Sequence, residues 1–306
     1  MTKPNIALIG LGLIGSSLGH AIKKHGLAQH VSGYARSRKT RETALDIGFV
    51  DVVYESAAAA AQGADIIFFN VPMGAFYSLA AEIMPVLKPG AIITDVGSVK
   101  ASVIEDISPI LRSDVYLVPG HPIAGTEQSG PTSGFAELFV GRWCVLTPTP
   151  ETNLRAVETV AKLWRDIGSD VEFMDADHHD MVLAITSHIP HLIAYNIVGT
   201  ASDLEADTRS DVIKFSASGF RDFTRIAASD PVMWRDIFLR NKRAVLEMLS
   251  RFNEDLTALQ RAIRHDDGDT LQSMFSRTRD IRKSIIDAGQ DMAEPNFGRH
   301  NKTDEH

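Results

Sequence analysis

The sequence has only one cysteine, Cys144, and this excludes an internal disulfide bond. Chains without disulfide bonds are typical of reducing compartments, so we expect a cytoplasmic protein. Cys144 lies in the apolar stretch WCVLT, which predicts a buried strand and an inert thiol.

Positive charge is scarce relative to negative charge. The 306 residues include 31 Lys and Arg against 39 Asp and Glu, which gives a formal net charge of -8. A nucleic-acid-binding surface needs clustered Lys and Arg to neutralise phosphates, so this balance argues against a nucleic-acid partner. It favours a small-molecule substrate.

Long hydrophobic runs are also few. The first, NIALIGLGLIGSSLGHAI, resembles a signal peptide, but it carries regularly placed glycines and no clear cleavage site follows it. No other stretch approaches the roughly 20 apolar residues that are needed to span a bilayer. We therefore expect no membrane partner.

Up to about residue 174, short apolar runs alternate with helical patterns. In residues 151–168, for example, Leu154, Val157 and Trp164 recur on one helical face. This alternation predicts an α/β fold for residues 1–174, a Rossmann-type doubly wound and mostly parallel sheet with helices on both faces. The runs that predict strands are NIALIG, VSGYA, DIIFFNV, AIITDV, VYLVPG, CVLTP and VEFMD.

From residue 175 the strand signals vanish and several helices are predicted, two of them long. Both long helices carry an apolar stripe, which an elongated helical domain often buries against a second copy. Residues 175–290 are therefore predicted to form an all-α substrate and homodimerisation domain, and the polar residues 291–306 a disordered tail. The stripes are Val245, Met248, Leu249, Phe252, Leu256 and Leu259, and Leu271, Met274, Phe275, Ile281 and Ile285.

The stretch GLGLIG follows the first predicted strand and begins a helix. Gly10 permits a tight turn, Gly12 lets the backbone approach a pyrophosphate, and Gly15 lets the helix pack close to the strand. Backbone N–H groups at the helix N-terminus, which begins with Leu13 and Ile14, would bind the phosphates. The pattern predicts a dinucleotide site, with a plain tight turn as the alternative.

The end of the second predicted strand bears on which dinucleotide is bound. An acidic side chain there would bind the ribose 2′-hydroxyl of NAD, but the sequence GYARSRKT has no carboxylate. Arg36, Ser37 and Arg38 are suited to a 2′-phosphate, which favours NADP over NAD. The alternative is a solvated helix start at which NAD is tolerated.

Two further stretches follow predicted strands, so they fall at the carboxyl ends of the sheet, where ligands bind in such folds. NVPM places Val71 and Pro72 there, beside the cofactor, and DVGSVK places Ser98 where it can face the nicotinamide or the substrate. Ser98 could also cap the helix that follows.

Three polar segments lack the apolar pattern that is typical of residues packed in a hydrophobic core. GHPIAGTEQSG places His121 between Gly120 and Pro122 on a predicted loop, where chemistry often occurs. The second segment carries His178, His179, His188 and His191, and the third carries Arg221, Asp222, Arg225 and Trp234.

The histidines of the second segment raise the question of a metal site. Zinc needs three or four converging ligands, and the His188-x-x-His191 pair is only approximately adjacent on a helix, so no metal is predicted. His178 and His179 are interpreted as polar residues at a helix start, where nearby aspartates favour the positive end of the helix dipole.

The stretches GLGLIGSS, DVGSVK, GHPIAGTEQSG, SHIPH and GFRDFTRIAASDPVMWRDI, in this order, resemble the prephenate/arogenate dehydrogenase family over residues 5–290. The resemblance implies a dinucleotide domain followed by a helical dimerisation domain. It also implies NAD(P)-dependent oxidative decarboxylation of prephenate to 4-hydroxyphenylpyruvate, or of arogenate to tyrosine, and leaves both substrates open. Many members carry an aspartate after the second strand, where this chain has Ala35 and Arg36.

The resemblance also implies residue roles. His121 would accept the proton of the substrate hydroxyl, a task that suits a neutral imidazole, and Ser98 would hydrogen-bond this histidine or the hydroxyl. Arg225 would hold the ring carboxylate, and His191, with His188 beside it, would face the substrate side chain. Binding and structural roles are both open for four residues that match positions around the pocket mouth and the domain or subunit boundary: Thr126, Glu127, Asp222 and Trp234.

Two other functions are open at this point. Dehydrogenases of the 3-hydroxyacid or 6-phosphogluconate type share the glycine fingerprint but use a catalytic lysine in the second domain. Here Lys214 is the only lysine between Lys162 and Lys242, and nothing around it marks it as catalytic. A non-enzymatic NADP sensor would bind the cofactor without needing His121 or Arg225.

Overall fold

The computed structural model describes residues 3–126, 128–203, 214 and 218–287. The chain divides into two compact units, residues 1–248 and residues 249–306. The predicted domain boundary after residue 174 falls inside the first unit and stays a prediction. The predicted tail, residues 291–306, lies outside the described residues.

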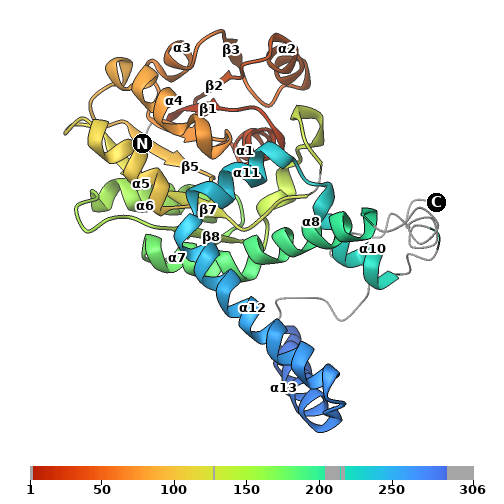
Figure 1. The fold of residues 1–306 in the computed structure, drawn as a ribbon. Coiled ribbons are helices and arrows are strands. Elements are labelled where there is room, and N and C mark those ends of the chain that lie inside the picture. The colour runs from red at the N-terminus through yellow and green to blue at the C-terminus, as the bar shows by residue number, and fades with distance from the viewer. Residues whose placement is uncertain (1–2, 127, 204–213, 215–217, 288–306) are drawn as a thin grey trace. The chain divides into compact units, whose positions relative to one another are not determined.

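Six parallel strands form the main sheet of the first unit, in the order β3-β2-β1-β4-β5-β6. Figure 1 labels β1, β2, β3 and β5 of this sheet. The strand order reverses between β1 and β4, which pair with each other. In such sheets ligands bind at this reversal, outside the carboxyl ends of the strands. The strands are β1 (Asn5–Ile9), β2 (His30–Tyr34), β3 (Val52–Tyr54), β4 (Ile66–Phe69), β5 (Ile92–Asp95) and β6 (Tyr116–Val118).

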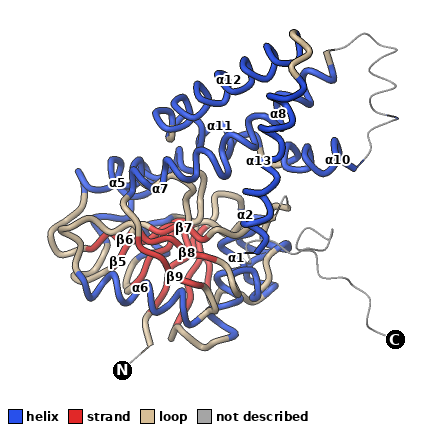
Figure 2. The backbone as a smooth tube through the Cα atoms, turned by 90° about the horizontal axis from the view of Figure 1, so that it is seen from below, coloured by secondary structure: helices blue, strands red, loops and turns tan. Residues whose placement is uncertain are grey.

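Alternate side chains of these strands enter two hydrophobic cores, one on each face of the sheet. Ile6 and Leu8 of β1 pack into one core, and Ala7 and Ile9 into the other. The predicted doubly wound fold is confirmed, and Figure 2 shows helices on both sides of the strands. One core includes α1 (Leu13–Lys24), α2 (Arg38–Ile47) and α6 (Leu154–Asp166), and the other includes α3 (Ala57–Ala61), α4 (Phe76–Ile83) and α5 (Ala101–Ile107).

The prediction missed two short strands. β3 has only three residues at the sheet edge, too few to show a strand pattern. The second is β7 (Gly120–Pro122), so the expectation that His121 lies on a loop was wrong. β7 pairs antiparallel with β8 (Trp143–Leu146), and β8 pairs parallel with β9 (Asp170–Phe173). Gly120 and Pro122 hid this strand because both residue types are rare inside strands.

Cys144 lies in β8 and is fully buried, which confirms the predicted buried strand. Burial raises the pKa of the thiol well above its usual value, so the protonated, unreactive form prevails at neutral pH.

The described residues after β9 form helices and the short turns between them, with no strand among them. A π-helical turn, residues 184–188, separates the first two helices, and Pro190 is the second residue of the helix that follows it. Proline lacks an amide hydrogen and crowds the carbonyl four residues earlier, which accounts for the widened turn. The helices are α7 (Ala176–Leu183), α8 (Ile189–Ser202), α10 (Ser218–Thr224), α11 (Pro231–Arg240), α12 (Lys242–Arg264) and α13 (Gly268–Asp287).

One helical stretch, Ala176–Ser202, is long and apolar enough by length and composition to cross a membrane. The expectation that no stretch after the first approaches this length was therefore wrong, because scattered Ser, Thr and His residues interrupt the run without adding charge. Only 28% of its most apolar window is buried. The stretch also carries the buried polar side chains His179, Asp180 and His188, which contact the rest of the first unit.

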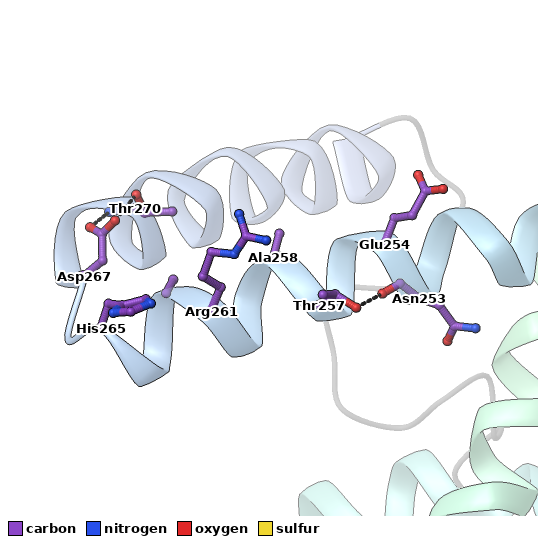
Figure 3. Close-up of a pocket in the computed structure, with 9 residues that line it drawn as sticks. Asn253, Glu254, Thr257, Ala258, Arg261, His265, Asp267 and Thr270 are labelled. Carbon is purple, nitrogen blue, oxygen red and sulfur yellow. Dashed lines mark hydrogen bonds between the residues drawn. The ribbon is translucent and has the colours of Figure 1, made fainter.

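In the second unit, a groove of about 610 Å³ lies between the end of α12 and the start of α13 (Figure 3). The Asp267 carboxylate accepts hydrogen bonds from the amide (3.0 Å) and the hydroxyl (2.7 Å) of Thr270, which stabilises the first turn of α13. None of the predicted site residues lines this groove. Several large apolar side chains of these helices are more than half exposed: Leu256, Ile263, Phe275 and Ile281.

Candidate active site

The three glycines of GLGLIG lie where β1 meets β4. Gly10 has a φ of +107°, and a Cβ there would lie 2.2 Å from the carbonyl oxygen of Asn70. A Cβ at Gly15 would lie 2.1 Å from the carbonyl oxygen of Gly10. At Gly12, which caps α1, a Cβ would meet nothing within 4 Å. Open space thus adjoins the helix N-terminus at Leu13 and Ile14, the geometry that suits a phosphate.

The residues after β2 were predicted to determine the preference between NADP and NAD. Ser37 caps α2, and its hydroxyl oxygen accepts a hydrogen bond of 3.4 Å from the amide of Thr40. Arg38 pairs with Glu42 at 2.7 Å, one turn along the same helix. Both side chains therefore contribute to the start of α2, as expected if these residues form a solvated helix start and not a 2′-phosphate site. Arg36 is exposed at the end of the strand, the position expected for a contact with a 2′-phosphate.

The loops after β4 and β5 border the same edge of the sheet. Val71 is half-buried and Pro72 is exposed. Ser98 is half-buried and does not cap the helix that follows, because α5 begins three residues later, after Lys100. The amides of Lys100 and Ala101 instead donate to the carboxylate of Asp180, at 2.7 and 3.0 Å.

His121 is buried and contacts a second histidine. Its Nδ1 lies 2.9 Å from Nε2 of His179, whose Nδ1 lies 2.8 Å from Oδ1 of Asp180. The interpretation of His179 as a polar helix-start residue was wrong, because its side chain is fully buried. Asp175 and the exposed His178 do lie at the helix start, where Asp175 caps α7.

Burial controls the charge of these two rings. It lowers the pKa of His121 well below 6.5, and the neighbouring His179, Lys100 and His188 lower it further. Burial also lowers the pKa of His179, against the opposing effect of its hydrogen bond to Asp180. Both imidazoles are therefore neutral at pH 7, the form that can accept a proton.

A buried ion pair fixes the backbone just before His121. The ammonium of Lys100 contacts the carboxylate of Asp95 and donates to the carbonyl oxygen of Gly120 at 2.7 Å. Asp95 in turn accepts from the amides of Gly97 (2.8 Å) and Gly120 (3.1 Å). Burial raises the pKa of Asp95 and lowers that of Lys100, while each partner opposes the shift of the other.

His188 is held by Asn241, which follows α11. The amide nitrogen of Asn241 lies 3.1 Å from Nδ1 of His188 and donates to the main-chain oxygen of Asp180 at 2.8 Å. Burial lowers the pKa of His188 to about 4. Its Nε2 is buried and has no hydrogen-bond partner among the described residues.

His191 and Trp234 stack, with ring centroids 3.7 Å apart and an interplanar angle of 23°. Nδ1 of His191 lies 2.9 Å from the carbonyl oxygen of Ser187. Burial is the main cause of its lowered pKa, and the positive charge of Arg225 lowers it further. Trp234 is buried beneath this contact.

Two contacts tie α11, which carries Trp234, to segments that pack on the main sheet. Asp236 accepts a hydrogen bond of 3.2 Å from the amide of Gly74, and a Cβ at Gly74 would lie 2.7 Å from this carboxylate. Arg240 pairs with Asp106 of α5 at 2.9 Å. These contacts hold α11 against the main sheet within the first unit.

The remaining predicted residues are not brought into this cluster. Thr126 is exposed, and its hydroxyl accepts a 3.2 Å hydrogen bond from the amide of Gln128. Asp222 is exposed on α10, and Glu127 lies outside the described residues. Within the described parts of the chain, no group of three or more His, Cys, Asp or Glu residues could hold a metal ion.

The sequence matches two family models that together span most of its length. Residues 18–173 match the nucleotide-binding domain of prephenate dehydrogenase, and residues 175–277 match its dimerization domain. The chain belongs to the prephenate dehydrogenase family. It is an oxidoreductase of tyrosine biosynthesis that carries out oxidative decarboxylation, and the hydroxyacid-dehydrogenase and sensor alternatives are not favoured.

Individual relatives support the assignment of this chain to the prephenate dehydrogenase family. The chain is 42% identical to a cyclohexadienyl dehydrogenase of Zymomonas mobilis, over 92% of this chain and 96% of that protein. It is similar to the prephenate dehydrogenase of Aquifex aeolicus in complex with hydroxyphenyl propionate and NAD+, with a TM-score of 0.87, 32% identity, and coverage of 93% and 99%. It is also similar to an arogenate dehydrogenase of Synechocystis, with a TM-score of 0.77, 28% identity, and coverage of 92% and 99%.

Sequence reasoning missed several polar residues around His121 in this family member. Asp95 and Lys100 lie at the ends of the quoted stretch DVGSVK, and Asp180 follows directly after His179. The sequence held a signal for Asp95 and Lys100. They have opposite charges and lie at and just after the end of an apolar strand run, and charged residues are seldom buried unless they are paired. Asn241 carries no such signal, because its neighbours are ordinary helix residues.

Proposed function

We propose that His121 accepts the proton of the substrate's 4-hydroxyl while hydride leaves the ring carbon that bears it. When bound, the dinucleotide supplies the nicotinamide that takes up this hydride. The observation that carries the proposal is a buried, neutral His121 hydrogen-bonded to the first helix after the nucleotide domain. A neutral imidazole at this position takes up the proton as positive charge builds on the ring carbon. Loss of CO2 then makes the ring aromatic.

The other polar residues bind and orient the substrate. Arg225 holds the ring carboxylate, because a guanidinium can donate two parallel hydrogen bonds to it. His191, beside Arg225, and the neighbouring His188 face the substrate side chain. Ser98 hydrogen-bonds His121 or the substrate hydroxyl. Resemblance alone supports binding roles for Thr126, Glu127 and Asp222, whereas Trp234 supports His191 by stacking.

The dinucleotide binds at the β1–β4 crevice, with its pyrophosphate at Gly10, Gly12 and the first turn of α1, including Leu13, Ile14 and Gly15. Val71 and Pro72 border it from β4. The preferred cofactor is NADP, because Arg36 is exposed at the end of β2 and no carboxylate follows that strand. Ser37 and Arg38 contribute less, since each already has a partner within α2.

The protein is a cytoplasmic homodimer, joined through its helical residues. Two separate apolar surfaces are available to a second copy: exposed side chains such as Phe275 and Ile281 in the second unit, and the largely unburied stretch Ala176–Ser202 in the first. The unpaired Cys144 fits a reducing compartment. Sedimentation equilibrium tests this point, and a monomer at micromolar concentration would contradict it.

Four assays test the proposed reaction. Prephenate and arogenate are each incubated with NADP+ and with NAD+, and reduction is followed at the nicotinamide absorbance. Turnover of either substrate supports the proposal and identifies both the substrate and the cofactor. Absence of turnover in all four assays, from folded protein that binds the cofactor, would contradict it.

A further inference from the structure

His121, His179 and Asp180 form a chain of hydrogen bonds whose hydrogen positions can be worked out. Asp180 stands at the far end, where its two carboxylate oxygens accept from the amides of Lys100 and Ala101 at the start of α5. Both oxygens thus act as acceptors, and a carboxylate has no hydrogen of its own to donate. The hydrogen between Asp180 and His179 therefore belongs to Nδ1 of His179.

The position of that hydrogen decides the next one. A neutral imidazole has one N–H group, so Nε2 of His179 carries a lone pair and accepts. Its partner, Nδ1 of His121, must then be the donor across the 2.9 Å contact. The single hydrogen of His121 is thus used inside the protein, and the lone pair of His121 is left on Nε2.

We propose that His179 and Asp180 are positioning residues that hold His121 in the tautomer with a hydrogen on Nδ1 and a free lone pair on Nε2. The inference rests on the proposed function, in which His121 accepts the hydroxyl proton. In the opposite tautomer Nε2 would carry a hydrogen, and the imidazole could not accept a proton at that atom. Neither residue touches the substrate in this account, since each acts through His121.

The Lys100–Asp95 pair supports the same arrangement from the other side. It binds both the amide and the carbonyl oxygen of Gly120, through Asp95 and Lys100 respectively, so the strand that carries His121 is fixed at the preceding residue. His121 is paired with Val145 in the ladder between β7 and β8. The backbone at His121 is therefore held by contacts that do not involve His179. A change at His179 can alter the tautomer of His121 without displacing its backbone.

The first measurement needs no turnover. A ¹⁵N NMR spectrum of histidine-labelled protein at neutral pH distinguishes protonated from unprotonated ring nitrogens, and the His121→Asn variant identifies the signals of His121. We expect a protonated Nδ1 and an unprotonated Nε2 in the native protein. A hydrogen on Nε2 would overturn the proposal.

Variants of His179 then test whether this residue determines the tautomer of His121. His179→Leu removes the acceptor, so we expect His121 to lose its tautomer preference and kcat to fall about 10²-fold, with the substrate KM nearly unchanged. His179→Gln keeps an amide oxygen near the position of Nε2 and should retain the tautomer, with kcat within about 10-fold of the native value. His178→Gln, at the exposed neighbouring position, is the matched control and should change neither quantity.

Binding of NADP+, measured by calorimetry, checks that each variant is folded. The proposal is overturned if His179→Leu keeps both the native tautomer and the native kcat, or if His179→Gln loses as much activity as His179→Leu. If His179→Leu does not fold, the spectrum of the native protein and the kinetics of His179→Gln still test the proposal. Failure of the proposed function would look different, since His121→Asn would then keep full turnover whatever the tautomer.

Discussion

Asn241 holds His188 through a hydrogen bond of 3.1 Å between its amide nitrogen and Nδ1 of the ring. The same nitrogen donates to a main-chain carbonyl oxygen, that of Asp180, so the orientation of the amide is unambiguous. Nδ1 of His188 must therefore accept, and its Nε2 carries a hydrogen. This buried donor has no partner among the described residues, which suits a group that meets an oxygen of the substrate.

Replacing Asn241 with Asp should reverse this arrangement. A carboxylate accepts from Nδ1 of His188, so the hydrogen leaves Nε2 and the donor toward the substrate is lost. We expect the substrate KM to rise about 10-fold, the effect of one hydrogen bond, with a smaller change in kcat. Steady-state kinetics test this, with Asn196→Asp on the exposed face of α8 as the control. An unchanged KM would show that His188 does not donate to the substrate.

His121→Asn removes the proton acceptor but keeps a polar side chain of similar size. Turnover should fall by about 10²- to 10⁴-fold, the usual contribution of a general base, while the dissociation constant of NADP+ stays the same. Stopped-flow turnover and calorimetric binding measure the two quantities. Native turnover in this variant would remove the proposed role of His121.

Arg225→Ala should mainly weaken substrate binding. Loss of a charge-assisted hydrogen bond costs about 1.5–3 kcal/mol, which corresponds to a rise in KM of about 10- to 150-fold. Arg155→Ala, on the exposed face of α6, removes the same charge elsewhere and should leave KM unchanged. Equal KM values in both variants would mean that the ring carboxylate binds to another residue.

Arg36→Asp should shift the cofactor preference toward NAD. The change removes the cation near the 2′-phosphate and supplies the carboxylate that binds a 2′-hydroxyl, so kcat/KM for NADP+ should fall at least about 10-fold relative to NAD+. Lys39→Asp makes the same charge change three residues away on α2 and is the control. A native ratio in both variants would mean that Arg36 does not bind the 2′-phosphate.

Stability should decline as the pH falls below 6.5, in part because His188 is buried in its neutral form. Its folded-state pKa of about 4 lies below the ordinary 6.5, so between these values the unfolded chain has bound a proton that the folded chain has not. The stabilisation is complete above pH 6.5 and is lost as the pH falls toward 4.

Urea unfolding between pH 4.5 and 7 would measure this loss, about 1.4 kcal/mol per pH unit for one group. His188→Gln should show a shallower pH dependence by about that amount, because Gln does not titrate. The other buried histidines, His121 and His179, remain in both proteins and contribute equally. Parallel curves for the two proteins would contradict the assignment.

The sequence alone determined the features that depend on residues close together along the chain. Gly10, Gly12 and Gly15 mark the dinucleotide crevice because a strand, a tight turn and a helix start all fall within a dozen residues. Alternation of apolar runs with helical patterns likewise predicted the doubly wound sheet, and the burial of Cys144 followed from its own strand.

Only the tertiary structure decided how His121 is held. His179 is 58 residues away, Asp180 caps a helix 79 residues before it, and Asn241 joins from a third element. None of these side chains shows its partner within its own segment, and the interpretation of His179 was wrong for this reason. Whether a polar side chain is solvated or buried against a partner depends on packing between distant elements, a property that local patterns of polarity do not record.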